Sequence, residues 1–123
     1  YAPSAEVMLH VALGGQAEES QRFFDAMNEY GVEYDIIGQS YYPEWHGTLE
    51  ELETNTNALV LKYNKPLIVV EYRDHYLDIE RIVSSLPNGL GRGTFIWEAT
   101  SPQWGKLFDE SGATTEAIRA YNR

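Results

Sequence analysis

Carboxylates, aromatic rings and imidazoles follow the short apolar runs of this sequence, and these are the groups that bind sugars. Glu71 ends the run Leu67–Glu71, and Trp97 and Glu98 close another run. Rings of Trp and Tyr present apolar faces for stacking, and carboxylates accept hydrogen bonds from hydroxyl groups. Cleavage of a glycosidic bond needs two carboxyl groups. The candidate site residues are His10, Ser40, Tyr41, Trp45, His46, Glu71, Trp97 and Glu98.

Each candidate also has a purely structural explanation. A glutamate that ends an apolar run can return to solvent or pair with an arginine such as Arg73 or Arg92. His10 can be a hydrogen-bonded core histidine, and the tryptophans can serve packing alone. The three histidines are far apart and lack the spacing of metal ligands, so we predict no metal site and no cofactor.

Composition and motifs exclude several other classes. The 9 Lys and Arg residues against 19 Asp and Glu residues give a net charge of −10, which repels nucleic acid. No apolar run approaches the roughly 18 residues of a membrane span. The glycine pairs lack a phosphate-binding pattern. Tyr42 replaces the second glycine of a nucleophile elbow after Gly38-Gln39-Ser40, which disfavours a serine hydrolase.

Four β-α units can position the candidates. The predicted strands start at residues 7, 34, 67 and 94, and their spacings of 27, 33 and 27 residues fit βαβ crossovers. Thr48 and Glu51 form a T-x-x-E capping box at the start of one helix. The candidates then collect at the carboxyl ends of parallel strands, where α/β proteins carry their chemistry. The predicted strands are 7–13, 34–41, 67–71 and 94–97, and the predicted helices are 18–30, 48–63, 76–86 and 115–121.

The pattern forms one α/β unit over residues 1–123, because no linker divides it. Two architectures remain open at this point. One is a small open sheet, and the other is part of a (β/α)8 barrel, which needs about 250 residues and eight units. A compact flavodoxin-like domain is a weaker alternative, because it needs glycine-rich phosphate turns that the sequence lacks.

Three motifs resemble glycoside hydrolase family 53, the arabinogalactan endo-β-1,4-galactanases. They are YDIIGQSYYPEWHGTLEEL at 34–52, KPLIVVE at 65–71 and GTFIWE at 93–98. The resemblance implies a retaining glycosidase built on a (β/α)8 TIM barrel, with β-1,4-galactan or a related polysaccharide as substrate. It also implies that the four strands are strands five to eight, the carboxyl-terminal half of the barrel.

The resemblance assigns roles to individual residues. Glu71 is the expected nucleophile, Trp97 the sugar-stacking platform, and Tyr41 a hydrogen-bond partner of the nucleophile or the sugar. The acid/base glutamate is expected upstream of Tyr1, outside this chain. The expected lining of neighbouring subsites is Ser40, His10, Trp45, His46 and Glu98.

Two departures from the family pattern flank the expected site. The loop after Glu71 is short, so we carry over no calcium site, and Ala99 replaces a proline after Trp97-Glu98.

An isolated half is expected to be inactive. Its open sheet edges should pair with the amino-terminal half or lead to self-association. A polymeric substrate implies a secreted or periplasmic protein. The alternative function is a carbohydrate-binding relic without catalysis.

Overall fold

The fold is a four-stranded parallel sheet with helices on one side. The computed structural model describes residues 4–121, apart from the side chains of residues 119 and 120. Its elements are β1 (Met8–Val11), α1 (Ala17–Glu29), β2 (Ile36–Ser40), α2 (Pro43–His46), α3 (Leu49–Tyr63), β3 (Leu67–Glu71), α4 (Tyr76–Ser84), η1 (Pro87–Gly89), β4 (Gly91–Thr94) and η2 (Glu116–Tyr121).

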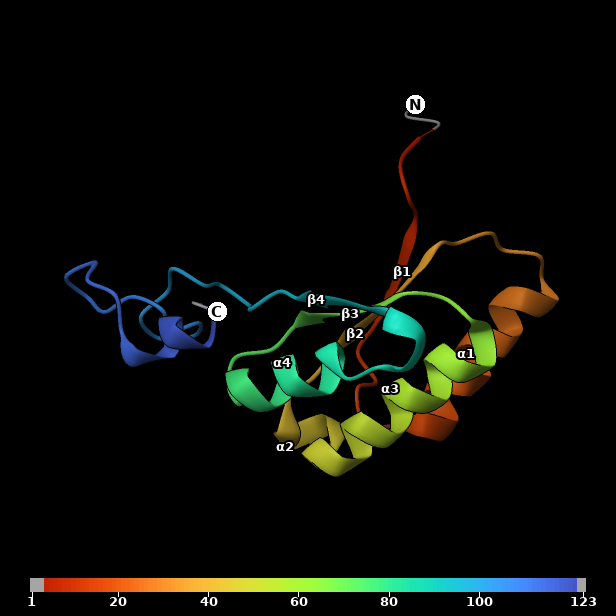
Figure 1. Cartoon of the computed structure of the whole chain (residues 1–123), viewed down its shortest axis with the longest axis horizontal. Coiled ribbons are helices and arrows are strands. Elements are labelled where there is room, and N and C mark those ends of the chain that lie inside the picture. Colours follow the sequence, from red (N-terminus) through yellow and green to blue (C-terminus); the bar gives the residue numbers. More distant parts are fainter. Residues whose placement is uncertain (1–3, 122–123) are drawn as a thin grey trace.

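The strands lie in the order β1-β2-β3-β4, and every neighbouring pair is parallel. Helices α1, α3 and α4 cover the same face of this sheet, and the opposite face carries no helix of the described chain (Figure 1). The predicted α/β fold of four consecutive βα units is confirmed. Because the units are strung in one direction, the carboxyl ends of all four strands meet at one edge.

The covered face of the sheet and the helices enclose the hydrophobic core. Ile37, Leu67 and Val69 of the sheet are fully buried there, together with Phe24 of α1 and Leu59 of α3. The β-branched and aliphatic residues of the strands therefore do two things at once. They favour extended backbone, and they supply the apolar surface that α1, α3 and α4 cover.

The predicted capping box of α3 is present. The Glu51 backbone N–H donates to Thr48 Oγ1 at 3.2 Å, and the Thr48 backbone N–H donates to Glu51 Oε2 at 2.7 Å. The helix ends at Asn64, which adopts the left-handed conformation with φ of 50°. These local signals explain why the helix bounds match the predicted range closely.

The fourth strand corrects the sequence prediction. It runs over Gly91–Thr94, whereas we predicted 94–97. Gly91 lies so close to α4 that a Cβ atom there would sit 1.8 Å from the carbonyl oxygen of Val83. Tight packing of α4 on the sheet thus makes a strand from a glycine-rich segment that local propensity places in a turn.

Three helical segments also differ from the prediction, among them the 3-10 helix η1 over Pro87–Gly89, which was not predicted. The short helix α2, Pro43–His46, was not predicted, and the last segment is a 3-10 helix over Glu116–Tyr121 rather than an α-helix over 115–121. Pro43 stands at the start of α2, where its missing N–H costs nothing. Among residues 4–121, we find no helix with the length and hydrophobicity that a membrane span requires.

Candidate active site

A cleft of about 340 Å³ lies at the carboxyl ends of the strands. Its lining comes from the end of β3 and from the segments that follow β2, β3 and β4. The lining residues are Tyr42, Trp45, Glu71, Arg73, Trp97, Glu98 and Trp104. Four of the eight candidate residues therefore share one cavity, namely Trp45, Glu71, Trp97 and Glu98.

Glu71 reaches this cleft because β3 carries one extra residue. Gln39 pairs with Val69, but the next residue of β2, Ser40, pairs with Glu71, so Val70 is left over as a bulge. Strict alternation from the buried Leu67 and Val69 would turn Glu71 toward the helices as well. The extra residue reverses that direction, which is a common use of bulges beside active sites.

The Glu71 carboxylate is held by one hydroxyl group. The hydroxyl of Tyr42 donates to Glu71 Oε1 at 2.8 Å. Burial raises the pKa of the Tyr42 hydroxyl, and the neighbouring Glu71 carboxylate raises it further. Tyr42 therefore stays protonated and remains a donor, which fixes one carboxylate oxygen and leaves the other available.

Exposed indole rings surround this carboxylate. Trp45 is 65% exposed, Trp97 44% and Trp104 40%. The Trp45 ring meets the Tyr42 ring edge-on, with 5.4 Å between the centroids. Large aromatic rings left open around a carboxylate match a ligand with apolar faces and hydroxyl edges.

Arg73 does not pair with Glu71, so the structural explanation that involved Arg73 does not hold. Its guanidinium bonds the carboxylate of Glu44 on α2, and its Nε lies 3.5 Å from Asp74 Oδ2. The pKa of the Glu44 carboxyl is lowered first by the backbone N–H of Glu44 and then by the bond from Arg73. Arg92, the other arginine considered, does not line the cleft.

His10 and Ser40 form a pair on the open face of the sheet, beside the cleft. His10 Nε2 and Ser40 Oγ are 2.6 Å apart, and Ser40 lies opposite Glu71 in the register. His10 is exposed, so the alternative of a buried core histidine does not apply. The pair lies one strand away from the carboxylate, next to the cleft lining.

Tyr41 and His46 lie elsewhere than expected. Tyr41 is 1% exposed, and its hydroxyl donates to the carbonyl of Gly47 at 3.0 Å. The expected bond to Glu71 is made by Tyr42 instead, because successive residues of the extended backbone that continues β2 point to opposite faces. His46 is 7% exposed and accepts the backbone N–H of Tyr42 on Nδ1 at 3.0 Å. Burial lowers the pKa of this imidazole, which favours its neutral form.

Sequence reasoning missed three lining residues, Tyr42, Arg73 and Trp104. The signal for Tyr42 was available, because Ser40 and Tyr42 are two residues apart and share a face. No pattern in the sequence pointed to Trp104, because it lies after all four strands and does not directly follow the end of one. Its loop is held where Gly105 meets residue 98: a Cβ atom on Gly105 would lie 2.4 Å from the Glu98 carbonyl oxygen.

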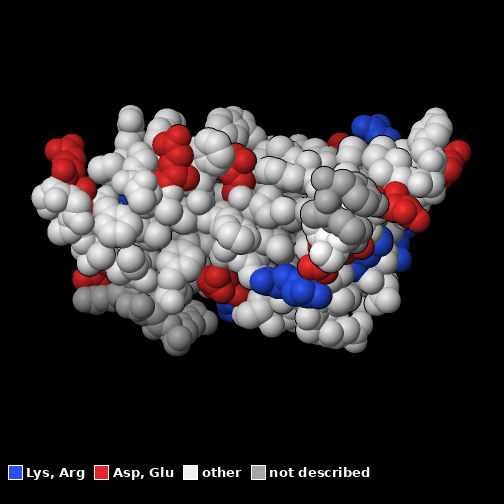
Figure 2. All heavy atoms as spheres, turned by 90° about the horizontal axis from the view of Figure 1, so that it is seen from above, with Lys and Arg blue, Asp and Glu red and all other residues white. Residues whose placement is uncertain are grey.

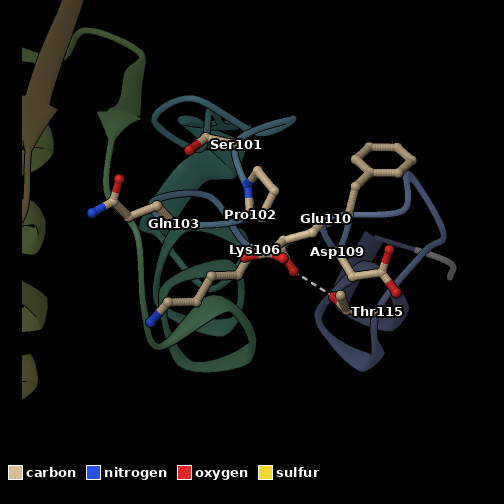
Figure 3. A pocket seen from close by; sticks show the side chains of 8 residues that line it. Ser101, Pro102, Gln103, Lys106, Asp109, Glu110 and Thr115 are labelled. Carbon is tan, nitrogen blue, oxygen red and sulfur yellow. Dashed lines mark hydrogen bonds between the residues drawn. The ribbon is translucent and has the colours of Figure 1, made fainter.

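A second hollow, of about 660 Å³, lies in the segment 101–115. The side chains of Gln103 and Lys106 point away from Asp109 and Thr115, while Thr115 Oγ1 donates to the main-chain carbonyl of Lys106 (Figure 3). Asp109 is engaged by its own loop, where Ser111 lowers the pKa of its carboxyl by hydrogen bonding. Since no set of polar groups converges there, we place the candidate site at the cleft around Glu71.

Charge on the open face is sparse and mostly acidic. Figure 2 looks onto the side opposite the helices and shows a largely uncharged surface, with separate acidic residues and most of the basic residues in the right half of the view. Within the described part of the chain, we find no group of three or more His, Asp or Glu side chains placed to hold a metal ion. The surface thus suits a neutral ligand better than a polyanion.

Comparisons with known proteins find a matching family model and related sequences. The model of the family described as Glycosyl hydrolase family 53 matches residues 1–80. An "Uncharacterized protein in bgaB 5'region" of Niallia circulans is 36% identical over 132 residues, which covers 80% of this chain and 35% of that protein. An arabinogalactan endo-beta-1,4-galactanase of Cellvibrio japonicus is 40% identical over 68 residues, covering 54% of this chain and 17% of that protein.

The fold has a close counterpart among solved structures. The GH53 catalytic domain of Ignisphaera aggregans superposes with a TM-score of 0.82 at 22% identity, covering 94% of this chain and 46% of that chain. The chain thus spans about a third or less of these two relatives, and about half of this catalytic domain. The four βα units correspond to half of a (β/α)8 barrel.

Proposed function

The chain belongs to glycosyl hydrolase family 53, and on this premise we propose that it carries the nucleophile of a site that hydrolyses β-1,4-galactan or arabinogalactan. The observation that carries the proposal is the Glu71 carboxylate, held by Tyr42 within a cleft of exposed indole rings. Glu71 lies inside the matched residues 1–80. A galactanase among the relatives supports the choice of substrate.

In the proposed reaction, a Glu71 oxygen attacks the anomeric carbon of a bound galactosyl unit. The bond from that carbon to the glycosidic oxygen breaks, and a second carboxylic acid protonates the departing oxygen. Water then hydrolyses the glycosyl-enzyme ester with overall retention, which requires the two carboxyl groups to lie about 5–5.5 Å apart. We assign the second carboxyl group to the other half of the barrel.

The remaining lining residues would bind the sugar. Trp97 offers a stacking surface next to Glu71, and Trp45 and Trp104 extend the aromatic wall. Glu98 can accept hydrogen bonds from sugar hydroxyls. His10 and Ser40 would face the neighbouring subsite once the open face is enclosed.

Closure of the barrel is part of the proposal. β1 and β4 are the edges of the sheet, and apolar side chains are exposed around its open face, among them Met8 at 39% and Phe95 at 63%. We propose that these strands are five to eight of a barrel, and that an amino-terminal half or a second copy covers the open face. A polymeric substrate would place the protein in the secreted or periplasmic space.

Covalent trapping tests the nucleophile without the missing acid. A dinitrophenyl 2-deoxy-2-fluoro-β-galactobioside should form an ester between C1 and Glu71, and dinitrophenolate departs without needing a proton. The fluorine slows hydrolysis of the ester. Mass spectrometry should find one galactobiosyl group per chain, on the peptide that contains Glu71.

Two variants complete this test. Glu71→Gln should abolish labelling, whereas Glu98→Gln should retain it. With the amino-terminal half added, Glu71→Gln should reduce galactan hydrolysis roughly a thousandfold or more. Labelling of another residue would refute the assignment. Binding of β-1,4-galactotetraose with neither labelling nor hydrolysis would identify a carbohydrate-binding relic instead.

A further inference from the structure

We propose that Arg73 is a positioning residue that joins the two aromatic walls of the cleft. One wall is α2 with the residue before it, which carries Tyr42 and Trp45. The other wall is the segment 97–104, which carries Trp97 and Trp104. The effect on sugar binding rests on the proposed function, but the positioning itself does not.

An ion pair attaches Arg73 to the first wall. Its guanidinium bonds the carboxylate of Glu44, the second residue of α2. The Arg73 side chain is only 22% exposed, whereas Arg81, which pairs with Glu53 at 3.2 Å, is 56% exposed. Glu44 itself is 48% exposed, so the enclosed partner is Arg73, whose charge is screened less by solvent than that of Arg81.

One aromatic contact, with Trp104, extends the link to the second wall, and another, with Tyr42, adds to the link with the first. The guanidinium carbon of Arg73 lies 5.4 Å from the centroid of the Trp104 ring and 5.8 Å from that of Tyr42. Arginine suits this place because its flat guanidinium stacks on rings while its N–H groups bond a carboxylate. One side chain therefore touches both walls.

The walls need such a link because little regular structure supports them. Helix α2 has 4 residues, and Trp104 lies in a segment of turns, where its backbone N–H donates to Ser101 Oγ at 3.2 Å. Arg73 follows the end of β3 by two residues, so the sheet anchors it. It thereby transmits the position of β3, and of Glu71, to both walls.

The first test measures motion of the Trp104 ring and requires no ligand. Indole N–H signals of the 123-residue chain can be assigned by replacing each tryptophan with phenylalanine in turn. In Arg73→Ala, the heteronuclear NOE of the Trp104 indole should fall, because the ring loses its partner. In Arg81→Ala, which removes an ion pair far from the cleft, it should stay unchanged. An unchanged Trp104 signal in Arg73→Ala would overturn the proposal.

The second test measures affinity for β-1,4-galactotetraose by calorimetry. Arg73→Ala should weaken binding by about threefold to tenfold, the size of a lost cation–π contact. Arg73→Lys keeps the charge without the flat stack and should fall in between. Arg81→Ala should bind like the wild type. Equal affinity of Arg73→Ala and Arg81→Ala would refute the role in binding.

The two tests separate this proposal from the proposed function. If the wild type does not bind galactotetraose, the substrate assignment fails, while the Trp104 signal still decides the role of Arg73. Should Arg73→Ala not fold, Glu44→Gln removes the ion pair from the opposite side and keeps the arginine. That variant should raise the mobility of Trp104 less than Arg73→Ala would, and no change at all would count against the link.

Discussion

The two faces of the sheet differ in how far their side chains are buried. On the covered face, Ile37, Leu67 and Val69 are fully buried beneath the helices. On the other side, Phe95 is 63% exposed and Trp97 44%. The same four strands thus carry a packed core on one side and a site on the other. Buried apolar packing is concentrated where the helices lie, and the face without helices carries the candidate site.

Tyr41 and Tyr42 show the difference between the two faces most clearly. They are adjacent in sequence, yet one hydroxyl bonds a backbone carbonyl beneath the sheet and the other bonds the Glu71 carboxylate in the cleft. Both rings are largely buried, so burial does not distinguish them. Their hydrogen-bond partners do, because Tyr41 bonds the main chain of Gly47 and Tyr42 bonds the side chain of the candidate site residue Glu71.

The largest difference between the faces is expected in stability. Ile37→Ala should lower the free energy of unfolding by about 3 kcal/mol, because it opens a cavity in the core. Phe95→Ala removes a larger side chain but should change it by less than about 0.5 kcal/mol, since its ring is largely in water. Urea denaturation of both variants measures this. The chain is diluted until sedimentation shows a monomer, and equal losses under that condition would mean that the Phe95 ring is buried rather than exposed.

The next largest loss of stability is expected at Gly15, which packs tightly against the backbone of His46. A Cβ atom on Gly15 would lie 2.0 Å from the His46 carbonyl oxygen, so Gly15→Ala should cost about 2 kcal/mol through overpacking. Gly31, with φ of 67° and open space around it, is the control. Gly31→Ala should cost about 1 kcal/mol from backbone strain alone. Thermal unfolding ranks the two, and a milder effect at Gly15 would contradict the packing described.

Removing the hydroxyl group of Tyr42 should change the labelling rate, whereas removing that of Tyr41 should change the free energy of unfolding. Tyr42→Phe removes the donor to Glu71 and should slow labelling by the fluorinated galactobioside about tenfold. Tyr41→Phe should leave the labelling rate unchanged but lower the free energy of unfolding by about 1 kcal/mol. Labelling kinetics and urea denaturation of both variants provide the data. A slow Tyr41→Phe with a normal Tyr42→Phe would reverse the assignment.

The smallest effect concerns pH. Burial lowers the pKa of His46 below the value of about 6.5 that a histidine has in an unfolded chain. Between those two values the unfolded chain binds a proton that the folded chain does not. The free energy of unfolding should therefore fall as pH decreases below about 6.5.

Denaturation at pH 7.5 and pH 5.5 checks this prediction against two variants. His46→Gln should lose less stability on acidification than the wild type, because it has no imidazole to protonate. His75→Gln alters an exposed histidine and should behave as the wild type does. If His46→Gln and the wild type respond equally, the neutral buried imidazole is not responsible.

Much of the fold could be predicted because its signals are local. Apolar runs, the capping box at Thr48 and the spacing of the units each depend on a few neighbouring residues. The position of the fourth strand could not be predicted in this way, because Gly91 is extended through its packing against α4. The site was predicted in part: Glu71, Trp45, Trp97 and Glu98 line one cleft. Their catalytic roles remain predictions that the labelling experiment addresses.

The amino-acid sequence alone determined that four strands and their helices alternate, and that a glutamate ends the third strand. Only the tertiary structure decided where that glutamate points. Alternation within β3 would have aimed Glu71 into the core, and the bulge at Val70, measured against β2, turned it into the cleft. The contacts of Arg73 with Glu44 and Trp104 likewise join segments far apart in sequence. Side-chain direction depends on register between strands, and register is a long-range property that no local pattern specifies.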